Sequence, residues 1–251
     1  MNHLKILHDY LTNRSQHPVE GGGLPFVTIS RQAGAGGHLL AYVIMTDFLK
    51  YAAANDLFGG WHVFDKEITE ILAQDPILRD SMATIRDAHF KSEARNFLES
   101  LFAGRDAPYL ATKKSFEIVY LLAAIGKTII VGRGACCVAR RLPLGIHIRL
   151  VAPEATRIKW IVRRFKISED DARTAMLRED RDRQRMFTTF FNRDIDDPLL
   201  YDAVWNTASV DLHEISESVI TMLRRRKETH KGDVIDPSNR DLADFFRFKK
   251  E

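Results

Sequence analysis

The chain has 251 residues, of which 45% are hydrophobic and 28% are charged, and this is the composition of a soluble protein that can bury one large core. A formal net charge of +3 does not demand a nucleic-acid partner, and no run of 18 apolar residues is present to span a membrane. The first residues lack the apolar centre of a signal peptide, so we expect a cytoplasmic protein. Cys136 and Cys137 are adjacent, a spacing that suits buried thiols better than a disulfide or a metal site.

Two segments precede the first expected strand. Residues 3–12 carry apolar side chains at helical spacing and predict a short amphipathic helix. Pro18 and the three glycines that follow it predict a linker. We therefore assign residues 1–24 to an N-terminal helix and linker, ahead of a main domain over residues 25–226.

The main domain begins with a strand, a glycine-rich loop and a helix. Phe26 to Ile29 is a short apolar run that predicts a strand. Residues 33–37 contain three glycines, and apolar residues then continue to about residue 54 without a Gly or Pro, which predicts a helix.

Strands and helical stretches alternate through the rest of the chain. The expected strands are residues 61–64, 127–131, 145–151 and 202–206. The expected helices are residues 66–125 in several pieces, 154–165, 168 to about 186, and 210–223. Ser168, followed by three acidic residues, predicts a capped helix N-terminus. The polar composition of residues 227–251 predicts a C-terminal tail.

This alternation predicts an α/β fold with a parallel five-stranded sheet flanked by helices. In such folds ligands bind beyond the carboxyl ends of the strands. Arg31, Asp65 and Arg133 follow three of the expected strands, so we expect them to converge on one crevice.

The glycine-rich loop is a candidate phosphate-binding site, because glycines let backbone N–H groups approach an anion and a helix N-terminus adds its dipole. It departs from the P-loop pattern G-x-x-x-x-G-K-[ST]. On that frame Arg31 takes the first Gly position, Gly37 the Lys position and His38 the Ser/Thr position. The alternative is a strand–helix turn that holds no ligand.

The densest charge lies between Arg178 and Arg185. Arg178, Arg181 and Arg185 share one helical face, and Asp182 lies one turn from two of them. This pattern is typical of a solvated face with internal salt bridges. Arginine is also the residue that binds phosphate through two parallel hydrogen bonds, so the same face could close over a phosphoryl group.

Taken together, these motifs resemble the cytidylate kinase-like family, a divergent branch of the P-loop nucleoside monophosphate kinases. The matching stretches are Ile29 to Gly37, Phe64 to Ile68, Val131 to Ala135, Arg149 to Pro153, Arg178 to Arg185, Asp197-Pro198, Tyr201-Asp202 and Asn206-Thr207. The resemblance covers roughly residues 25 to 225. It implies a kinase-like fold with a helical acceptor-binding insertion over residues 66–125 and a helical lid over residues 168–191.

The resemblance also implies roles for individual residues. The donor, ATP with Mg²⁺, would be held by the loop residues Arg31, Gln32, Ala33, Gly34, Ala35, Gly36, Gly37 and His38, and no protein ligand of the metal is identified. The catalytic arginines would be Arg157, Arg178, Arg181 and Arg185. The acceptor nucleotide would be held by Asp65, Arg133, Arg178, Asp182 and Arg185.

Three functions stay open at this point. The first is transfer of the ATP γ-phosphate to a nucleoside monophosphate, with CMP or dCMP as the first guess, by a monomer or homodimer that binds neither nucleic acid nor membrane. The second is a catalytically weak or inactive nucleotide-binding sensor, because Gly37 stands where the P-loop lysine is expected. The third is nucleic-acid binding through the arginine-rich helix, which its interspersed aspartates disfavour.

Overall fold

A single sheet of five parallel strands forms the centre of the protein. The computed structural model describes residues 24–53, 56–67, 69 and 110–229. The strands lie in the order β2-β3-β1-β4-β5. Their bounds are Phe26–Arg31 for β1, His62–Phe64 for β2, Thr128–Val131 for β3, Gly145–Val151 for β4 and Ala203–Asn206 for β5. The parallel α/β architecture expected from the sequence is therefore confirmed.

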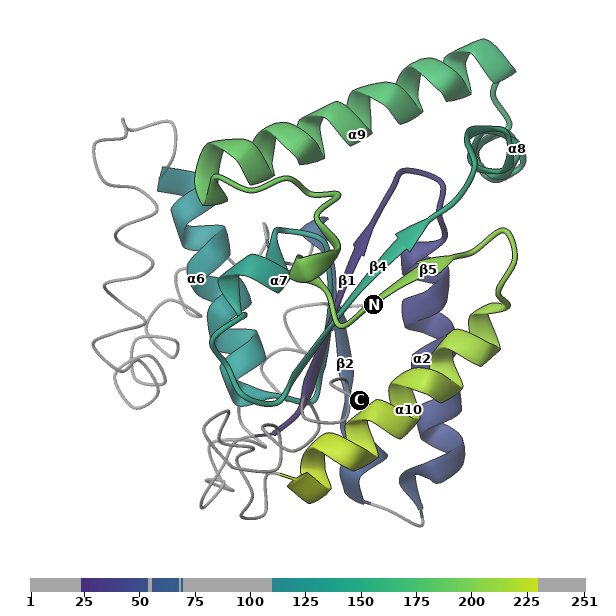
Figure 1. The fold of residues 1–251 in the computed structure, drawn as a ribbon. Helices are drawn as coiled ribbons and strands as arrows, with labels where there is room; N and C mark the ends of the chain where they lie inside the picture. Colours follow the sequence, from purple (N-terminus) through teal and green to yellow (C-terminus); the bar gives the residue numbers. More distant parts are fainter. Residues whose placement is uncertain (1–23, 54–55, 68, 70–109, 230–251) are drawn as a thin grey trace, which may run out of the picture.

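Helices cover both faces of this sheet (Figure 1). The α-helices are α2 (Gly37–Ala52), α6 (Leu110–Ile125), α7 (Ala135–Val138), α8 (Glu154–Phe165), α9 (Glu169–Phe191) and α10 (Leu212–Thr229), with short 3₁₀ turns at η1 (Asp56–Phe58) and η3 (Pro198–Leu200). Helices α2 and α10 pack on one face, whereas α6 and α7 pack on the other. Helices α8 and α9 lie beyond the carboxyl ends of the strands.

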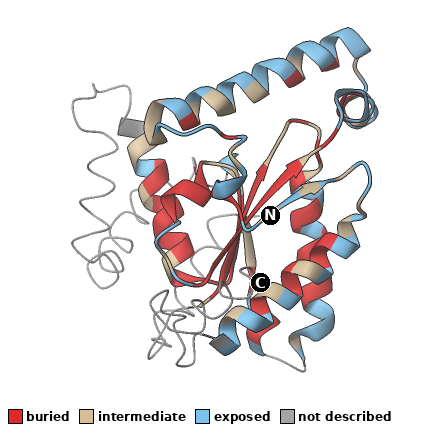
Figure 2. Ribbon diagram, in the orientation of Figure 1, coloured by how far each residue is buried: buried red, intermediate tan, exposed pale blue. Residues whose placement is uncertain are grey.

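The alternation of side chains along β1 divides the core between the two faces. Val27 and Ile29 are fully buried against α2 and α10, whereas Phe26 belongs to the cluster formed with α6 and α7. Successive residues of a strand point to opposite faces, so a strand covered on both sides buries nearly all of its side chains, here including the polar Thr28 and Ser30. Figure 2 shows the result, with buried strands between the buried faces of the helices.

Helix α9 has a different character from the core helices. Its N-terminus is capped as expected, because the Ser168 hydroxyl accepts a hydrogen bond from the backbone N–H of Asp171 at 3.1 Å. The helix crosses above the strand ends, and most of its surface is exposed (Figures 1 and 2). Its buried side chains include Ala172, Met176 and Phe187, which lie on its inward side.

Several expected boundaries differ from the observed ones, including those of β1, α9 and α10. Strand β1 continues through Ser30 to Arg31, and α9 continues past Met186 to Phe191. Helix α10 extends to Thr229, so the segment assigned to a polar tail begins inside a helix. Polar, helix-favouring residues such as Arg226 and Lys227 continue a helix that apolar periodicity alone does not reveal. The expected N-terminal helix, most of the tail and residues 70–109 of the expected insertion lie outside the described residues.

The end of the expected insertion belongs to the core of the sheet domain. Helix α6 buries Phe116, Val119 and Leu122 in the same cluster as Phe64 of β2 and Ile130 of β3. It therefore contributes to the central domain itself. Within the described ranges, no helix has both the length and the apolar character that crossing a bilayer requires.

Candidate functional site

The glycine-rich loop, residues 31–38, joins β1 to α2 at the carboxyl end of the sheet. Gly34 and Gly36 both adopt positive φ angles, 78° and 83°. A Cβ atom at Gly34 would lie 2.7 Å from the carbonyl oxygen of Arg157, so this position also requires a residue without a side chain. A Cβ at Gly36 would meet no atom within 4 Å. The loop therefore packs against Arg157 at Gly34, whereas its backbone is open to the surroundings at Gly36.

The first turn of α2 has no side-chain cap. Gly36 is its N-cap residue, and no acidic residue occupies the first turn. The unsatisfied N–H groups and the positive end of the helix dipole thus face the open side of the loop. This arrangement suits an anion such as a phosphate group.

Arg157 and Asp180 support the loop from helices α8 and α9. The Arg157 side chain is buried, and it donates hydrogen bonds to the carbonyl oxygens of Ala152 at 3.1 Å and Ala33 at 3.2 Å. Asp180 pairs with Arg157 at 2.5 Å and accepts a hydrogen bond from the backbone N–H of Ala33 at 2.7 Å. One aspartate therefore ties the expected lid directly to the loop.

A cavity of about 430 Å³ lies over the loop, between the loop and helices α8 and α9. We call it the loop cavity. Its lining comprises Arg31, Gln32, Ala33, Gly34, Gly36, Gly37, His38, Trp160, Ile161, Phe165, Ile167, Ala175, Met176, Glu179 and Arg183. One wall is thus made of backbone and polar groups, whereas the other carries aromatic and aliphatic side chains.

A second, more open cavity of about 840 Å³ lies beside it, at the ends of β1, β2 and β3. We call it the strand-end cavity. Its lining comprises Arg31, His38, Asp65, Lys66, Glu67, Arg133, Arg178, Glu179, Asp182, Arg183 and Met186. The predicted convergence of Arg31, Asp65 and Arg133 is confirmed, because β2, β3 and β1 are neighbours in the sheet.

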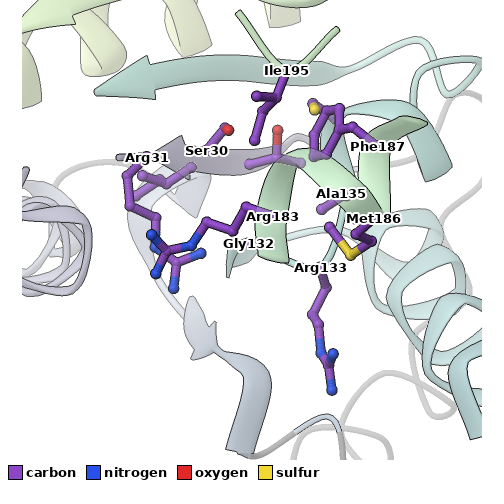
Figure 3. A pocket seen from close by; sticks show the side chains of 13 residues that line it. Ser30, Arg31, Gly132, Arg133, Ala135, Arg183, Met186, Phe187 and Ile195 are labelled. Atoms are coloured by element: carbon purple, nitrogen blue, oxygen red, sulfur yellow. The ribbon is translucent and has the colours of Figure 1, made fainter. Parts of the chain in front are cut away.

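The two cavities share four lining residues, which are Arg31, His38, Glu179 and Arg183. Arg31 and Arg183 also line a small pocket between β1 and α9, where their guanidinium groups lie together and the Arg133 side chain points away from them (Figure 3). Two guanidinium groups and the carboxylate of Glu179 thus lie at the boundary between the two cavities.

The electrostatics of this boundary are unusual for arginine. Burial, together with the neighbouring charge of Arg183, lowers the pKa of Arg31 to about 10. Arg183 itself is paired with Glu179 and with Asp180. On the exposed side, His38 Nε2 lies 3.5 Å from a carboxylate oxygen of Asp65.

The structure brings most of the predicted site residues to these cavities, but not all. Ala35 is buried, and its carbonyl oxygen accepts a hydrogen bond from Thr207. Arg157 lies beneath the loop and lines neither cavity. Arg181 and Arg185 are exposed on α9 and also line neither cavity.

Three residues that sequence reasoning did not single out have central positions, namely Glu179, Asp180 and Arg183. A signal for two of them is present in the sequence. Ala172, Met176, Asp180, Arg183 and Phe187 recur at spacings of three and four, so the buried stripe of α9 carries Asp180 and Arg183 toward the loop. The helical face chosen from the arginines alone is rotated away from that stripe.

Within the described residues, no cluster of three or more His, Cys, Asp or Glu side chains is arranged to hold a metal ion.

The chain is similar to known proteins over most of its length. The model of the cytidylate kinase-like family matches residues 26–209. A cytidylate kinase of Saccharolobus islandicus is 35% identical over 78 residues, which cover 31% of this chain and 41% of that protein. The aligned part thus spans less than half of the curated relative.

One solved structure shares the arrangement of elements over most of this chain. An uncharacterized protein from Eubacterium ventriosum superposes with a TM-score of 0.56 at 18% identity, over 80% of this chain and 98% of that one. Shikimate kinase from Bacteroides thetaiotaomicron gives a lower TM-score of 0.40 at 12% identity, over 81% of this chain and 98% of that one.

Proposed function

Because the chain belongs to the cytidylate kinase-like family, we propose that it is a nucleotide-dependent phosphotransferase that transfers the γ-phosphoryl group of ATP to a nucleoside monophosphate. The observation that carries this proposal is the pair of guanidinium groups at the boundary between two cavities. The loop cavity takes the donor, the strand-end cavity takes the acceptor, and Arg31 and Arg183 lie where they meet.

The loop cavity has the two surfaces that a nucleoside triphosphate needs. The open backbone at Gly36 and the uncapped start of α2 suit the phosphates. The apolar wall with Trp160, Phe165 and Met176 suits a nucleobase, which is flat and apolar on its faces. Mg²⁺ enters with the phosphates of ATP in this proposal, because Mg²⁺ is usually bound through substrate phosphates and one or two carboxylates.

The strand-end cavity suits a nucleoside monophosphate as acceptor. Arg133 and Arg178 supply positive charge for a phosphate, and Asp65 and Asp182 supply acceptors for hydrogen bonds from a sugar or a base. CMP and dCMP are the first acceptors to test. A phosphate acceptor is already an anion, so the reaction needs positioning and charge neutralisation more than a general base.

A second candidate function rests on Asp180. Its carboxylate is bonded to a loop N–H group, and Gly37 replaces the P-loop lysine, so the same site could bind a nucleotide without transferring phosphate. Such a protein would act as a nucleotide sensor. The two candidates differ in turnover and share the binding site.

A coupled assay of ADP release with Mg·ATP separates these candidates. It should be run with CMP, dCMP, UMP, AMP and GMP, each beside calorimetric titration with ATP. Arg178→Ala is the informative variant, because Arg178 lines the strand-end cavity, and Arg225→Ala on the exposed end of α10 is a control with the same change of charge.

We expect ADP release that requires one acceptor, with KM for that acceptor raised by Arg178→Ala and unchanged by Arg225→Ala. ATP binding without ADP release for any acceptor would favour the sensor. Absence of ATP binding would contradict both candidates.

A further inference from the structure

Gly37 lacks the side chain that a P-loop lysine would place at the start of the helix, and the Arg31 side chain fills that space. A Cβ atom at Gly37 would lie 2.9 Å from Cγ of Arg31 and 3.1 Å from its Cδ. The aliphatic part of Arg31 therefore packs over Gly37. A lysine at this position could not coexist with Arg31 in its observed conformation.

Gly132 provides a second contact, for the charged end of the same side chain. Gly132 follows β3 directly, and its φ angle is 85°. A Cβ atom there would overlap Nη1 of Arg31. Two glycines from separate segments thus leave room for one arginine, which lines the loop cavity and the strand-end cavity at once.

The charge of Arg31 has no counterion in the described part of the chain. Arg183 pairs with Glu179 and Asp180, but no carboxylate forms an ion pair with Arg31 among the described residues. Asp65 and Glu179 act on Arg31 only at longer range, whereas Arg183 and Arg133 repel it. A partly buried guanidinium beside a second guanidinium is costly unless an anion lies between them.

Burial and the neighbouring Arg183 both lower the pKa of Arg31, which agrees with a cation that lacks a bound partner. At a pKa of about 10 the group still carries its charge at neutral pH. The site is thus prepared for an anion at the junction of the two cavities.

We propose that Arg31 replaces the missing P-loop lysine, holding a phosphate of the bound nucleotide from the end of β1 while Gly37 and Gly132 make room for its side chain. In the standard pattern the cation follows the last glycine of the loop and reaches the β- and γ-phosphates. Here the cation has moved to the first position of the loop. This inference rests on the proposed function and identifies the residue that makes it possible without Lys at position 37.

An exchange of charges tests the assignment. Arg31→Met keeps the apolar stem over Gly37 and removes the charge, and Arg225→Met is the matched control on the exposed surface. Gly37→Lys restores the standard pattern but forces the new side chain against Arg31. The double variant Arg31→Ala/Gly37→Lys moves the cation back to the standard position. Each variant is titrated calorimetrically with Mg·ATP and with inorganic tripolyphosphate, after its unfolding transition has been measured.

We expect Arg31→Met to bind both ligands about 10- to 100-fold more weakly than the unchanged protein, because a charged hydrogen bond is lost. Gly37→Lys alone should also weaken binding. The double variant should bind both ligands more tightly than Arg31→Met, a gain that relief of the contact between the two side chains does not produce by itself.

Three results would overturn the assignment. If the unchanged protein binds Mg·ATP and Arg31→Met binds it equally well, Arg31 has no such role, although the proposed function stands. The assignment also fails if Arg31→Met binds the ligands weakly and the double variant binds them no more tightly than Arg31→Met does. If the unchanged protein binds neither ligand, the proposed function and this inference fall together.

Discussion

Asp180 of α9 and Arg157 of α8 meet beneath the glycine-rich loop, with Oδ2 of the aspartate 2.5 Å from Nη1 of the arginine. The other carboxylate oxygen of Asp180 accepts the Ala33 N–H at 2.7 Å. The pair therefore connects three segments of the chain, and its arginine is buried whereas its aspartate is about one quarter exposed. This geometry makes the expected lid part of the structural support of the loop.

Removal of this carboxylate should destabilise the protein. Asp180→Ala leaves the buried Arg157 guanidinium without its counterion and the Ala33 N–H without an acceptor, so we expect the free energy of unfolding to fall by roughly 2–4 kcal/mol. Asp182→Ala, which removes an exposed carboxylate on the same helix, should change it by less than about 0.5 kcal/mol. Urea unfolding compares the two. Equal effects would mean that the contact beneath the loop contributes nothing specific.

Arg183 should matter more for phosphoryl transfer than Arg181. Arg183 lines both cavities, whereas the Nε of Arg181 bonds the Leu177 carbonyl oxygen on the exposed side of α9. In the coupled assay of ADP release, Arg183→Ala should lower kcat about 100-fold, which is the usual effect of removing one hydrogen-bond donor from a negative charge that develops in the transition state. Arg181→Ala should lower it less than about threefold. The reverse order would show that α9 turns on closing and presents its other face.

His147 should make stability depend on pH between about 4 and 6.5. Burial lowers the pKa of this histidine from 6.5 to about 4, while its Nδ1 lies 2.8 Å from the Thr28 hydroxyl. The unfolded chain therefore takes up a proton in this window that the folded chain does not. Stability is complete above about pH 6.5 and falls as the pH drops toward 4.

The size of this effect can be measured with one substitution. Between pH 7.5 and pH 5.0 we expect His147 to contribute a loss of about 2 kcal/mol in the free energy of unfolding. His147→Asn should be less stable at pH 7.5 but should lack that part of the pH dependence. His38→Asn, which removes a largely exposed imidazole, should retain it. If the free energy of unfolding of His147→Asn falls between pH 7.5 and pH 5.0 as much as that of the unchanged protein, His147 is not the source of the pH dependence.

Gly134 should tolerate substitution worse than Gly36, although both have positive φ angles. A Cβ at Gly134 would lie 2.5 Å from a ring carbon of Phe191, which stacks on Phe116 with ring centroids 5.3 Å apart. A Cβ at Gly36 meets open space. We expect Gly134→Ala to cost about 3 kcal/mol through strain and displaced rings, and Gly36→Ala about 1 kcal/mol through strain alone. Chemical unfolding of both variants tests this difference. Similar losses in the free energy of unfolding would show that the Phe191 ring can move aside.

Local patterns in the sequence were sufficient to predict the parallel sheet covered by helices. Apolar strands such as residues 145–151 can be buried on both faces only in a sheet covered by helices, and the predicted strand matches β4 at both ends. The convergence of Arg31, Asp65 and Arg133 followed from the same rule, since parallel strands present their carboxyl ends at one edge. Boundaries were less predictable where polar residues continue a helix, as they do in α10.

The family resemblance was also readable from short motifs, because loop glycines and an arginine-rich run occur in a fixed order. It did not indicate which arginines reach the cavities. Periodicity groups side chains into faces, but the rotation of a helix about its axis is set by what it packs against. The buried residues Met176 and Phe187 of α9 orient Arg183 inward and leave Arg181 and Arg185 exposed.

The sequence by itself therefore determined the parallel sheet, the glycine-rich loop at its carboxyl edge and the cluster of arginines that follows. Only the tertiary structure decided that Arg31 lies over Gly37 and Gly132, and that Asp180 and Arg157 hold the loop from below. These contacts join residues that are far apart in the chain. Spacing along a chain carries information about one element at a time, whereas contacts between elements depend on how they pack.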